Sequence, residues 1–527
     1  MGDDSLSNTE IALQQACRYH QAGRLEHAKA IYHQILAIEP ENPDALHLLG
    51  VISHQNYNYN DGVKLITRAI EIAPNQSSFF NSLANILKDS GQYQRALDAY
   101  NHAVFIDSQD ELAHNNIGVL RHEQHQLSQA VDAYRKAIAI NPNYFEGYSN
   151  LGVALREQGK LDQAVESYQQ AIAINPDYSA GYNNLGTVLK EQGKLDQAIR
   201  AYRRAIKIDP GYIEAYNNLS HLELLRGNYI EGWHYYMARK MEPIDQLLPF
   251  DSSNTDLYQK NILFIHEQGL GDEIFFLRFV PQLKLRGAQV IYQSHPKLAN
   301  LVSKLTCIDR VIDSQGLSVE PDLTLALADL PFLMGMQDPT EIPLPISFPH
   351  IVEDRGYILD ELLDLGPPPY IGVTWYAGTQ VSHRSRFIHL YKEISLEFIA
   401  DLLSNLDATV IILQRNSTSS ELDRFNTYLG RKAYDLGGFD QDLENMAKLL
   451  VSLDEYIAVS NTNVHLRAAV GRTSRVLVPF PPEWRWMDSG AESIWYPGTV
   501  LYRQSKLGDW TKSIQRLKDD LETKFSH

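Results

Sequence analysis

Three polar residues in the C-terminal part of the chain have the types and spacing that suit anion binding. Asn461, Thr462 and Asn463 follow a short apolar run and precede a segment with helical spacing that carries His465. We therefore expect them at the start of a helix. There, backbone N–H groups without an intrahelical partner and the helix dipole favour a phosphate group. The sequence predicts phosphate binding at residues 461–463.

A second candidate segment is the glycine turn at residues 267–273, with the sequence EQGLGDE. Gly269 and Gly271 allow the backbone to bend close to a ligand. Asp272 would lie in the first turn of the helix that follows, where an acidic side chain is favoured on electrostatic grounds alone. Residue types by themselves therefore leave Asp272 as a helix-capping residue, and Glu267 and Glu273 are further carboxylates of the same turn.

The elements that hold these segments alternate between strands and helices. The apolar run 261–266, the glycine turn and the helical spacing after it form the opening of a βαβ unit. Further predicted strands lie at residues 288–293, 310–313, 370–378, 409–413, 456–460 and 475–478. A proline-rich passage over 339–369 separates two α/β lobes, which we place at 261–350 and 370–505. Ligands of such sheets bind outside the carboxyl ends of the strands, so we expect the site between the lobes.

The N-terminal half of the chain is an internal repeat. Five prolines are separated from one another by multiples of 34 residues: Pro40, Pro74, Pro142, Pro176 and Pro210. Three neighbouring copies of this repeat also match closely in their small and aromatic residues. This is the tetratricopeptide pattern, in which helical hairpins stack into a superhelix. We expect a tail at 1–8, six repeats and a degenerate cap over 9–246, and a polar linker at 247–260.

One row of side chains recurs along the repeats. Asn116, Asn150, Asn184 and Asn218 occupy the same position of successive units. A side-chain amide both donates and accepts hydrogen bonds, so the row can hold the backbone of an extended acceptor peptide on the concave face. The alternative is that these amides only bond neighbouring helices of the array.

Composition restricts the functional class. Asp and Glu outnumber Lys and Arg by 65 to 47, which gives a net charge of −18 and argues against a nucleic-acid binder. Two cysteines, Cys17 and Cys307, lie far apart and build no disulfide framework. We find no signal peptide and no membrane span, and we expect a cytoplasmic protein with a final helix at 506–527.

At this point the second half resembles a known group of enzymes. The turn 267–273 with Arg278, Pro281 and the run 283–288, and the segments 460–471, 476–480, 483–486, 495–497 and 502–504, are similar to glycosyltransferases of the heptosyltransferase type that carry N-terminal tetratricopeptide repeats. The resemblance implies a GT-B fold of two Rossmann-like lobes and a nucleotide-sugar donor. It also implies that Asp272 faces the acceptor as general base, that Gly269 and Gly271 border the donor, and that His465 keeps a donor-site position.

A second resemblance concerns the nucleocytoplasmic O-GlcNAc transferase. It covers the repeat array and the segment LYKEI at residues 390–394, with the helix and strand that follow up to Gln414 and Arg415. It implies that Lys392 meets the leaving diphosphate. Metal-independent transferases of this fold use side chains and a helix N-terminus for that purpose, so no metal and no cofactor beyond the donor are expected.

The likeness is incomplete at one position. Heptosyltransferase-like enzymes usually carry an Asp-Thr pair where this chain has Ser460 and Asn461. The missing acid contacts the sugar in that family, which leaves the donor sugar open. His465 is equally explained as a buried, hydrogen-bonded helix histidine. Two further motifs have a functional and a structural explanation. Trp484, Trp486, Trp495 and Tyr496 can stack on a sugar or a nucleobase, but we favour packing across the lobes. The Asp440-Gln-Asp442 triplet resembles the metal-binding Asp-x-Asp motif of the other glycosyltransferase fold, but a helix cap explains it here.

We therefore expect a metal-independent glycosyltransferase that moves a sugar from a nucleotide-sugar to an acceptor, with a protein acceptor recruited by the repeats. One alternative is a protein-interaction scaffold whose transferase-like domain is inactive. Another is a transferase that acts on a polysaccharide or a lipid-linked sugar and uses the repeats only to bind a partner.

Overall fold

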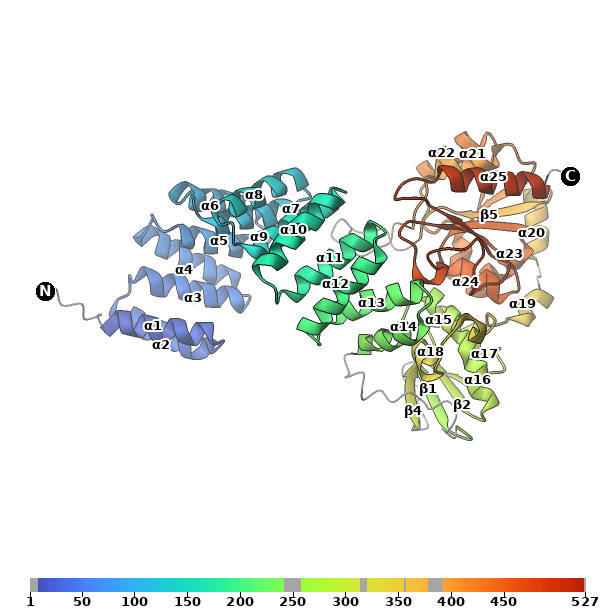
Figure 1. The fold of residues 1–527 in the computed structure, drawn as a ribbon, viewed down its shortest axis with the longest axis horizontal. Helices are drawn as coiled ribbons and strands as arrows, with labels where there is room; N and C mark the ends of the chain where they lie inside the picture. Colours follow the sequence, from blue (N-terminus) through green and yellow to red (C-terminus); the bar gives the residue numbers. More distant parts are fainter. Residues whose placement is uncertain (1–7, 241–256, 313–319, 355–356, 378–391, 526–527) are drawn as a thin grey trace. The chain divides into compact units, whose positions relative to one another are not determined.

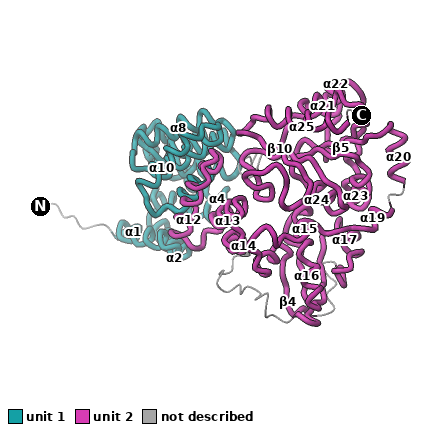
Figure 2. Tube along the Cα trace, turned by 45° about the vertical axis from the view of Figure 1, so that its right-hand side comes forward, with its two compact units in different colours: residues 1–188 teal, residues 189–527 magenta. Residues whose placement is uncertain are grey.

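The computed structural model describes residues 8–240, 257–312, 320–354, 357–377 and 392–525 (Figure 1). The chain divides into two compact units, 1–188 and 189–527, which Figure 2 shows in different colours. Most of the expected tail at 1–8 and of the expected linker at 247–260 lies outside the described residues. The second unit begins inside a helix, so it contains the last helical hairpins together with the α/β region.

The first unit consists of antiparallel helical hairpins. The first helices of the hairpins begin where the sequence period predicts; they are α1 (Asn8–Gln21), α3 (Pro43–Gln55), α5 (Ser77–Asp89), α7 (Glu111–Glu123), α9 (Phe145–Glu157) and α11 (Ser179–Glu191). The second helices are α2 (Leu25–Ile38), α4 (Tyr59–Ile72), α6 (Tyr93–Ile106), α8 (Leu127–Ile140) and α10 (Leu161–Ile174). Helix α11 crosses the boundary between the units.

Small residues and one aromatic residue explain how each hairpin packs. A Cβ atom on Gly152 would lie 2.8 Å from the ring of Tyr168, and one on Gly118 would lie 2.5 Å from Tyr134. Both tyrosines are buried. In these two hairpins the tyrosine ring fills the space that a side chain in place of the glycine would take. The recurring small and aromatic residues thus pack against each other within a hairpin.

The helical array continues into the second unit. Helices α12 (Leu195–Ile208), α13 (Ile213–Leu225) and α14 (Tyr229–Tyr236) are followed by the 3-10 helix η1 (Met237–Lys240). The described residues thus contain fourteen helices of the array, α1 to α14. Helix α13 and the shorter α14 correspond to the degenerate cap expected from about residue 213 to 246, of which residues 241–246 lie outside the described ranges.

A four-stranded parallel sheet forms the first α/β lobe. Its order is β3-β2-β1-β4, with β1 (Asn261–Ile265), β2 (Gln289–Gln293), β3 (Arg310–Ile312) and β4 (Leu323–Ala326). Its helices are α15 (Leu270–Phe276), α16 (Val280–Leu285), α17 (Pro296–Ser303) and α18 (Leu330–Leu333). The proline-rich passage that follows contains two short helices, α19 (Pro349–Glu353) and α20 (Ile358–Leu365).

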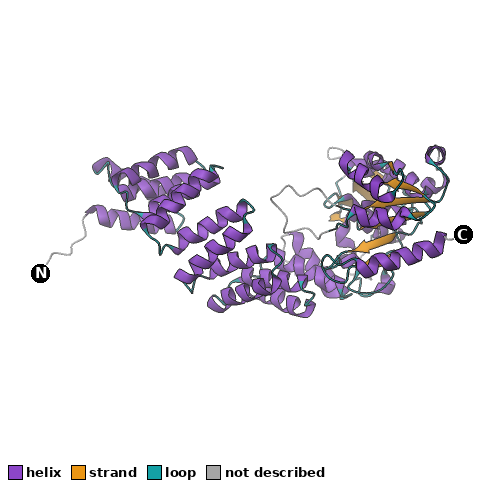
Figure 3. Ribbon diagram, turned by 90° about the horizontal axis from the view of Figure 1, so that it is seen from above, coloured by secondary structure: helices purple, strands orange, loops and turns teal. Residues whose placement is uncertain are grey.

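The second lobe contains a six-stranded parallel sheet, visible as orange arrows in Figure 3. Its order is β10-β9-β8-β5-β6-β7, with β5 (Tyr370–Thr374), β6 (Thr409–Ile412), β7 (Tyr434–Asp435), β8 (Glu455–Val459), β9 (Arg475–Val478) and β10 (Val500–Arg503). Its helices are α21 (Leu396–Ser404), α22 (Ser419–Leu429), α23 (Leu443–Ser452), α24 (Thr462–Ala469), α25 (Thr511–Phe525) and the 3-10 helix η7 (Trp484–Trp486).

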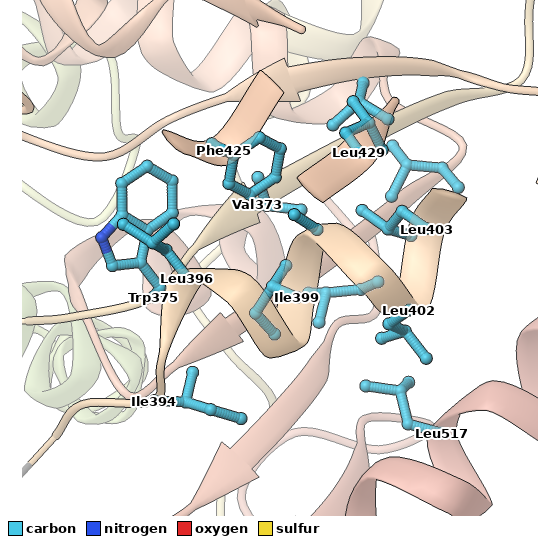
Figure 4. Packing of buried hydrophobic residues seen from close by; sticks show 14 of the residues in the cluster. Val373, Trp375, Ile394, Leu396, Ile399, Leu402, Leu403, Phe425, Leu429 and Leu517 are labelled. Carbon is cyan, nitrogen blue, oxygen red and sulfur yellow. The ribbon is translucent and has the colours of Figure 1, made fainter. Parts of the chain in front are cut away.

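The core of the second lobe explains why its strands are continuous apolar runs. Helices cover β5, so Val373 is fully buried, and Trp375 stacks on Phe425 of α22 with ring centroids 5.4 Å apart (Figure 4). Leu517 brings the C-terminal helix α25 into the same cluster. A parallel sheet covered on both faces needs such uniform strands. The arrangement confirms an α/β region of parallel sheets after the helical array.

Candidate functional site

A cleft of about 310 Å3 lies between the two α/β lobes, both of which belong to the second unit. It opens where β1, β5, β6 and β8 end at their carboxyl ends, which is the edge at which parallel sheets bind ligands. The eight residues that the sequence assigned to catalysis or donor binding all line it: Gly269, Gly271, Asp272, Lys392, Asn461, Thr462, Asn463 and His465.

The glycine turn connects β1 directly to α15. Gly269 is the N-cap residue of α15, and its backbone is extended. A Cβ atom on Gly271 would lie 3.0 Å from Cδ2 of His465 and 3.4 Å from Cα of Thr462. Gly271 therefore lets α15 approach α24 of the other lobe closely. Its small size serves helix–helix packing as well as the wall of the cleft.

Asp272 is engaged by an arginine from the opposite lobe. Its Oδ1 atom accepts a hydrogen bond from Nη2 of Arg485, and the Asp272 side chain remains 34% exposed. Asp272 also lies in the first turn of α15, where the helix dipole favours its charge. The position of Asp272 is therefore compatible with both sequence-based interpretations, a first-turn acid that stabilises the helix and a general base that faces the cleft.

Lys392 lies on the wall of the second lobe and is paired with a carboxylate. Its Nζ atom is 2.8 Å from Oε2 of Glu483. The lysine side chain is 27% exposed and the glutamate side chain 11%. Lys392 therefore supplies a cation to the cleft, but a neighbouring anion balances its charge.

Glu483 is the centre of a polar network that sequence reasoning missed. Its Oε2 atom accepts a hydrogen bond of 3.0 Å from the hydroxyl of Ser460, and Nη1 of Arg485 donates to Oε1 at 2.7 Å. Burial opposes ionisation of Glu483, but Lys392 and Arg485 hold the pKa of this carboxyl below its ordinary value. Burial likewise opposes the charge of Arg485, while Asp272 and Glu483 raise its pKa above the usual value. Glu483 and Arg485 are therefore both charged at neutral pH.

The predicted anion site is the start of α24. Asn461 is the N-cap residue, and its Oδ1 atom accepts a hydrogen bond of 3.2 Å from the N–H of Val464. Its amide also donates to the hydroxyl of Tyr456 at 3.1 Å. The side chain of Asn461 is therefore a cap. The N–H groups of Thr462 and Asn463 have no carbonyl partner within a helix, and both residues line the cleft.

His465 is a buried histidine of α24. Its Nδ1 atom is hydrogen-bonded to the hydroxyl of Tyr496, and its ring stacks on Trp486. Burial lowers the pKa of His465 well below its ordinary value, and Arg485 adds to the effect, so the ring is neutral at physiological pH. The structural interpretation of this residue therefore holds, although the residue also borders the cleft.

The aromatic residues after β9 form packing rather than a platform. Trp484, Trp486, Trp495 and Tyr496 are all buried. Trp484 packs edge-to-face against Trp233 of α14, with centroids 5.3 Å apart. The last helical hairpin is thus part of the structure that holds η7. Glu483, the N-cap residue of η7, lines the cleft, and Arg485 within η7 bonds Asp272.

Three further polar residues line the cleft, and the sequence had assigned none of them to the site: Lys297, Arg415 and Asp440. Nε of Arg415 lies 3.0 Å from Asp440, and Nζ of Lys297 donates to the Asp440 carbonyl at 3.2 Å. Asp442 caps α23, as the sequence indicated, through the N–H groups of Glu444 and Asn445. Within the described ranges, no group of three or more His, Cys, Asp or Glu side chains has a geometry that suits a metal ion.

The asparagine row of the array bonds between neighbouring first helices. In the first unit, Nδ2 of Asn116 donates to Oδ1 of Asn81 at 2.9 Å, and Nδ2 of Asn150 donates to Oδ1 of Asn115 at the same distance. Asn184 and Asn218 are partly buried at the same position of α11 and α13. The amides of Asn116 and Asn150 therefore serve the inter-helix role that the sequence left open. One N–H of each donating amide is used in this way.

Comparison with known proteins identifies the repeats. Residues 19–86 match the family described as tetratricopeptide repeat, and residues 84–125, 120–155, 154–193 and 186–222 match the family described as TPR repeat. Residues 19–222 are therefore tetratricopeptide repeats, which suggests a protein-interaction array. No described helix is long and apolar enough to cross a membrane.

Similar proteins have been found by sequence and by structure. Protein FlbA of Caulobacter vibrioides is 23% identical over 326 residues, which cover 56% of this chain and 52% of FlbA, so the chain spans about half the length of that relative. The MamA crystal structure has a TM-score of 0.29 and 22% identity, and the alignment covers 31% of this chain and 95% of MamA. Pseudomonas aeruginosa PilF has a TM-score of 0.36 and 17% identity, with 39% and 94% covered.

Proposed function

We propose that the protein transfers a sugar from a nucleotide-sugar donor to an acceptor that the tetratricopeptide repeats help to recruit. The proposal is supported by the cleft between the lobes. There the turn 269–272 of one lobe meets Lys392 and the first turn of α24 from the other. A carboxylate, an ammonium group and helix N–H groups on opposite walls of one cleft are the parts that such a transfer needs.

In the proposed reaction the acceptor hydroxyl attacks the anomeric carbon of the donor. Asp272 takes the proton of that hydroxyl as the new glycosidic bond forms. The bond between the anomeric carbon and the phosphate oxygen breaks, and the nucleoside diphosphate leaves with the electron pair. Lys392 and the N–H groups of Thr462 and Asn463 stabilise the negative charge that develops on the leaving oxygen. Attack opposite the leaving group inverts the configuration of the sugar.

The tetratricopeptide repeats indicate which class of acceptor the proposed transfer would use. Arrays of this type bind proteins or extended peptides on the concave face, so we infer a protein acceptor or a protein partner that brings the acceptor. A chain of this length with only two cysteines fits a reducing compartment, so we place the reaction in the cytoplasm. A glycan or lipid-linked acceptor is the alternative within the same reaction class.

A specific observation favours a second candidate function. Lys392 is paired with Glu483, and Asp272 with Arg485, so both groups of the proposed mechanism already have internal partners. A domain that had lost catalysis would retain such pairs for stability. The protein would then be an interaction scaffold with a transferase-like domain, in which the repeats alone carry the function.

Binding and labelling experiments separate these functions. Nucleotide sugars that differ in base and sugar are added to the full chain, and the melting temperature is measured. A transferase is stabilised by one donor class, whereas an inactive scaffold is stabilised by none. Incubation of the chain with the selected labelled donor and a cell extract then shows whether label enters protein or glycan. Label in neither fraction would leave the scaffold as the function.

A further inference from the structure

Glu483 contacts the groups that would serve a phosphate in this cleft. Lys392, Ser460 and Arg485 surround its carboxylate at 2.8, 3.0 and 2.7 Å. They come from three separate places in the second lobe: the segment before α21, the end of β8, and η7. Each is a donor that also suits a phosphate oxygen. The carboxylate therefore sits in a built anion site, and the protein itself supplies the anion.

The two oxygen atoms of Glu483 have different partners. Oε1 accepts from Arg485, which is buried and also bonds Asp272, whereas Oε2 accepts from Ser460 and Lys392. Lys392 is the more accessible partner at 27% exposure, and the Arg485 side chain is only 6% exposed. The Lys392 contact is thus the one that a ligand in the cleft can reach. The Ser460 and Arg485 contacts can hold the carboxylate when Lys392 leaves.

Charge balance gives this arrangement a consequence. Four linked groups meet here, Lys392 and Arg485 as cations and Glu483 and Asp272 as anions, and within this group the charges cancel. A diphosphate that enters brings further negative charge next to Glu483. The diphosphate binds Lys392 at full strength only if the lysine exchanges Glu483 for a phosphate oxygen. An ammonium group that binds the carboxylate and the phosphate together attracts each of them less strongly.

We propose that Glu483 is a built-in competitor for the diphosphate group of the donor, which holds Lys392 in position and weakens the binding of both nucleotide-sugar and nucleoside diphosphate. This inference rests on the proposed function, because it takes the ligand of the cleft to be a nucleoside diphosphate. In a reaction cycle, the competition by Glu483 would promote product release. Since the leaving group carries the diphosphate, an internal anion that returns to Lys392 favours its departure.

The test compares Glu483→Gln with the natural chain. Glutamine keeps the shape of the side chain and an acceptor for Ser460, but it removes the charge that competes for Lys392. Binding of the diphosphates of adenosine, guanosine, uridine and cytidine, and of inorganic pyrophosphate, is measured by calorimetry on the full chain. We expect the variant to bind the preferred nucleotide about tenfold more tightly, as is usual for one additional charge-assisted hydrogen bond in a partly screened site.

Two controls make the result specific to the cleft. Glu444→Gln removes another largely buried carboxylate that pairs with two lysines, Lys304 and Lys448, but lies outside the cleft lining. This variant should bind nucleotides as the natural chain does. The double variant Lys392→Ala with Glu483→Gln should lose the increase in affinity, because that increase comes from the freed ammonium group. A circular dichroism melt of each variant verifies that the fold is retained.

Each outcome decides between the proposals. Tighter binding by E483Q, or binding by E483Q where the natural chain binds nothing, supports the competitor role. Equal or weaker binding by E483Q, with binding by the natural chain, overturns the competitor role and leaves the proposed function standing. Binding by neither chain overturns both. Tighter binding by E483Q in a chain that transfers no sugar from any donor supports the competitor role and contradicts the transferase.

Discussion

Arg485 and Asp272 form an ion pair that joins the two α/β lobes across the cleft. Arg485 follows β9 in the second lobe, and Asp272 lies on α15 in the first. The arginine also bonds Glu483 and packs over the rings of Trp484 and Phe275, at 4.3 and 5.0 Å from the ring centroids. One buried guanidinium group thus fixes a carboxylate on each wall. The geometry of the site depends on it.

Replacement of Arg485 by Gln is expected to destabilise the second unit. The change leaves Asp272 and Glu483 without their shared cation, and Glu483 is nearly inaccessible to water. The loss of one partner of a buried ion pair costs about 3 kcal/mol. The free energy of urea unfolding measures it. Arg472→Gln, an exposed arginine of the same lobe, should change this free energy by less than about 0.5 kcal/mol. Equal stability of both variants would show that the pair across the cleft contributes nothing.

The turns inside the repeats predict a stabilising substitution. His125 has a φ of 60°, whereas the equivalent residue of the next repeat is Gly159 with a φ of 74°. A left-handed backbone strains a residue with a side chain, so His125→Gly should stabilise the first unit by about 0.5–1 kcal/mol. The reverse change, Gly159→His, should cost about 1 kcal/mol, although a Cβ there meets open space. Urea unfolding of both variants is the measurement, and a loss of stability in His125→Gly would refute the argument.

The amide contacts between repeats predict a cost for removing one of them. Asn150→Ala leaves Oδ1 of the buried Asn115 without its donor. Such a loss costs about 1–2 kcal/mol. Asn143→Ala, at an exposed position near the start of the same hairpin, serves as the matched control. If both changes have the same small effect on urea unfolding, the amide row does not stabilise the array and is available for a peptide.

Acid is expected to destabilise the first unit through His47. Burial, followed by the charge of His20, lowers the pKa of His47 to about 4 from the ordinary 6.5. The unfolded chain therefore binds the proton first, so this contribution to stability is present above pH 6.5 and is lost as pH falls toward 4. His47→Gln should reduce the acid dependence of the unfolding free energy by up to about 1.4 kcal/mol per pH unit. Identical pH dependence in both chains would exclude His47 as its source.

The periodic parts of the fold were predictable from the sequence. The repeat period places the first helix of every hairpin, because each hairpin needs the same small and aromatic positions to pack. Strands such as β5 and β8 are recognisable as buried apolar runs. Strands β4, β7 and β10 were missed. They are edge strands of two to four residues, too short to show a period against the turns around them.

Only those residues of the site that belong to a local sequence motif were predictable. The glycine turn and the polar start of α24 have local signatures, and both line the cleft. Glu483 and Arg485 lie in the segment 483–486, which carries part of the family resemblance, but their role was not predicted, since it comes from a loop that brings η7 beside Lys392 and Asp272. Contacts between residues so far apart in the chain arise only from the tertiary fold. A single sequence contains no spacing that reveals them.

The most direct test of the central claim is the initial rate of sugar transfer by the natural chain and by Asp272→Asn, with the labelled nucleotide sugar that stabilises the protein in thermal melts and an acceptor fraction from cell extract. The account predicts donor-dependent labelling by the natural chain. It also predicts a rate at least about 100-fold lower for the variant, with donor binding retained, because asparagine cannot accept the proton of the acceptor hydroxyl. Equal rates for the two chains, or no labelling with any donor, would contradict it.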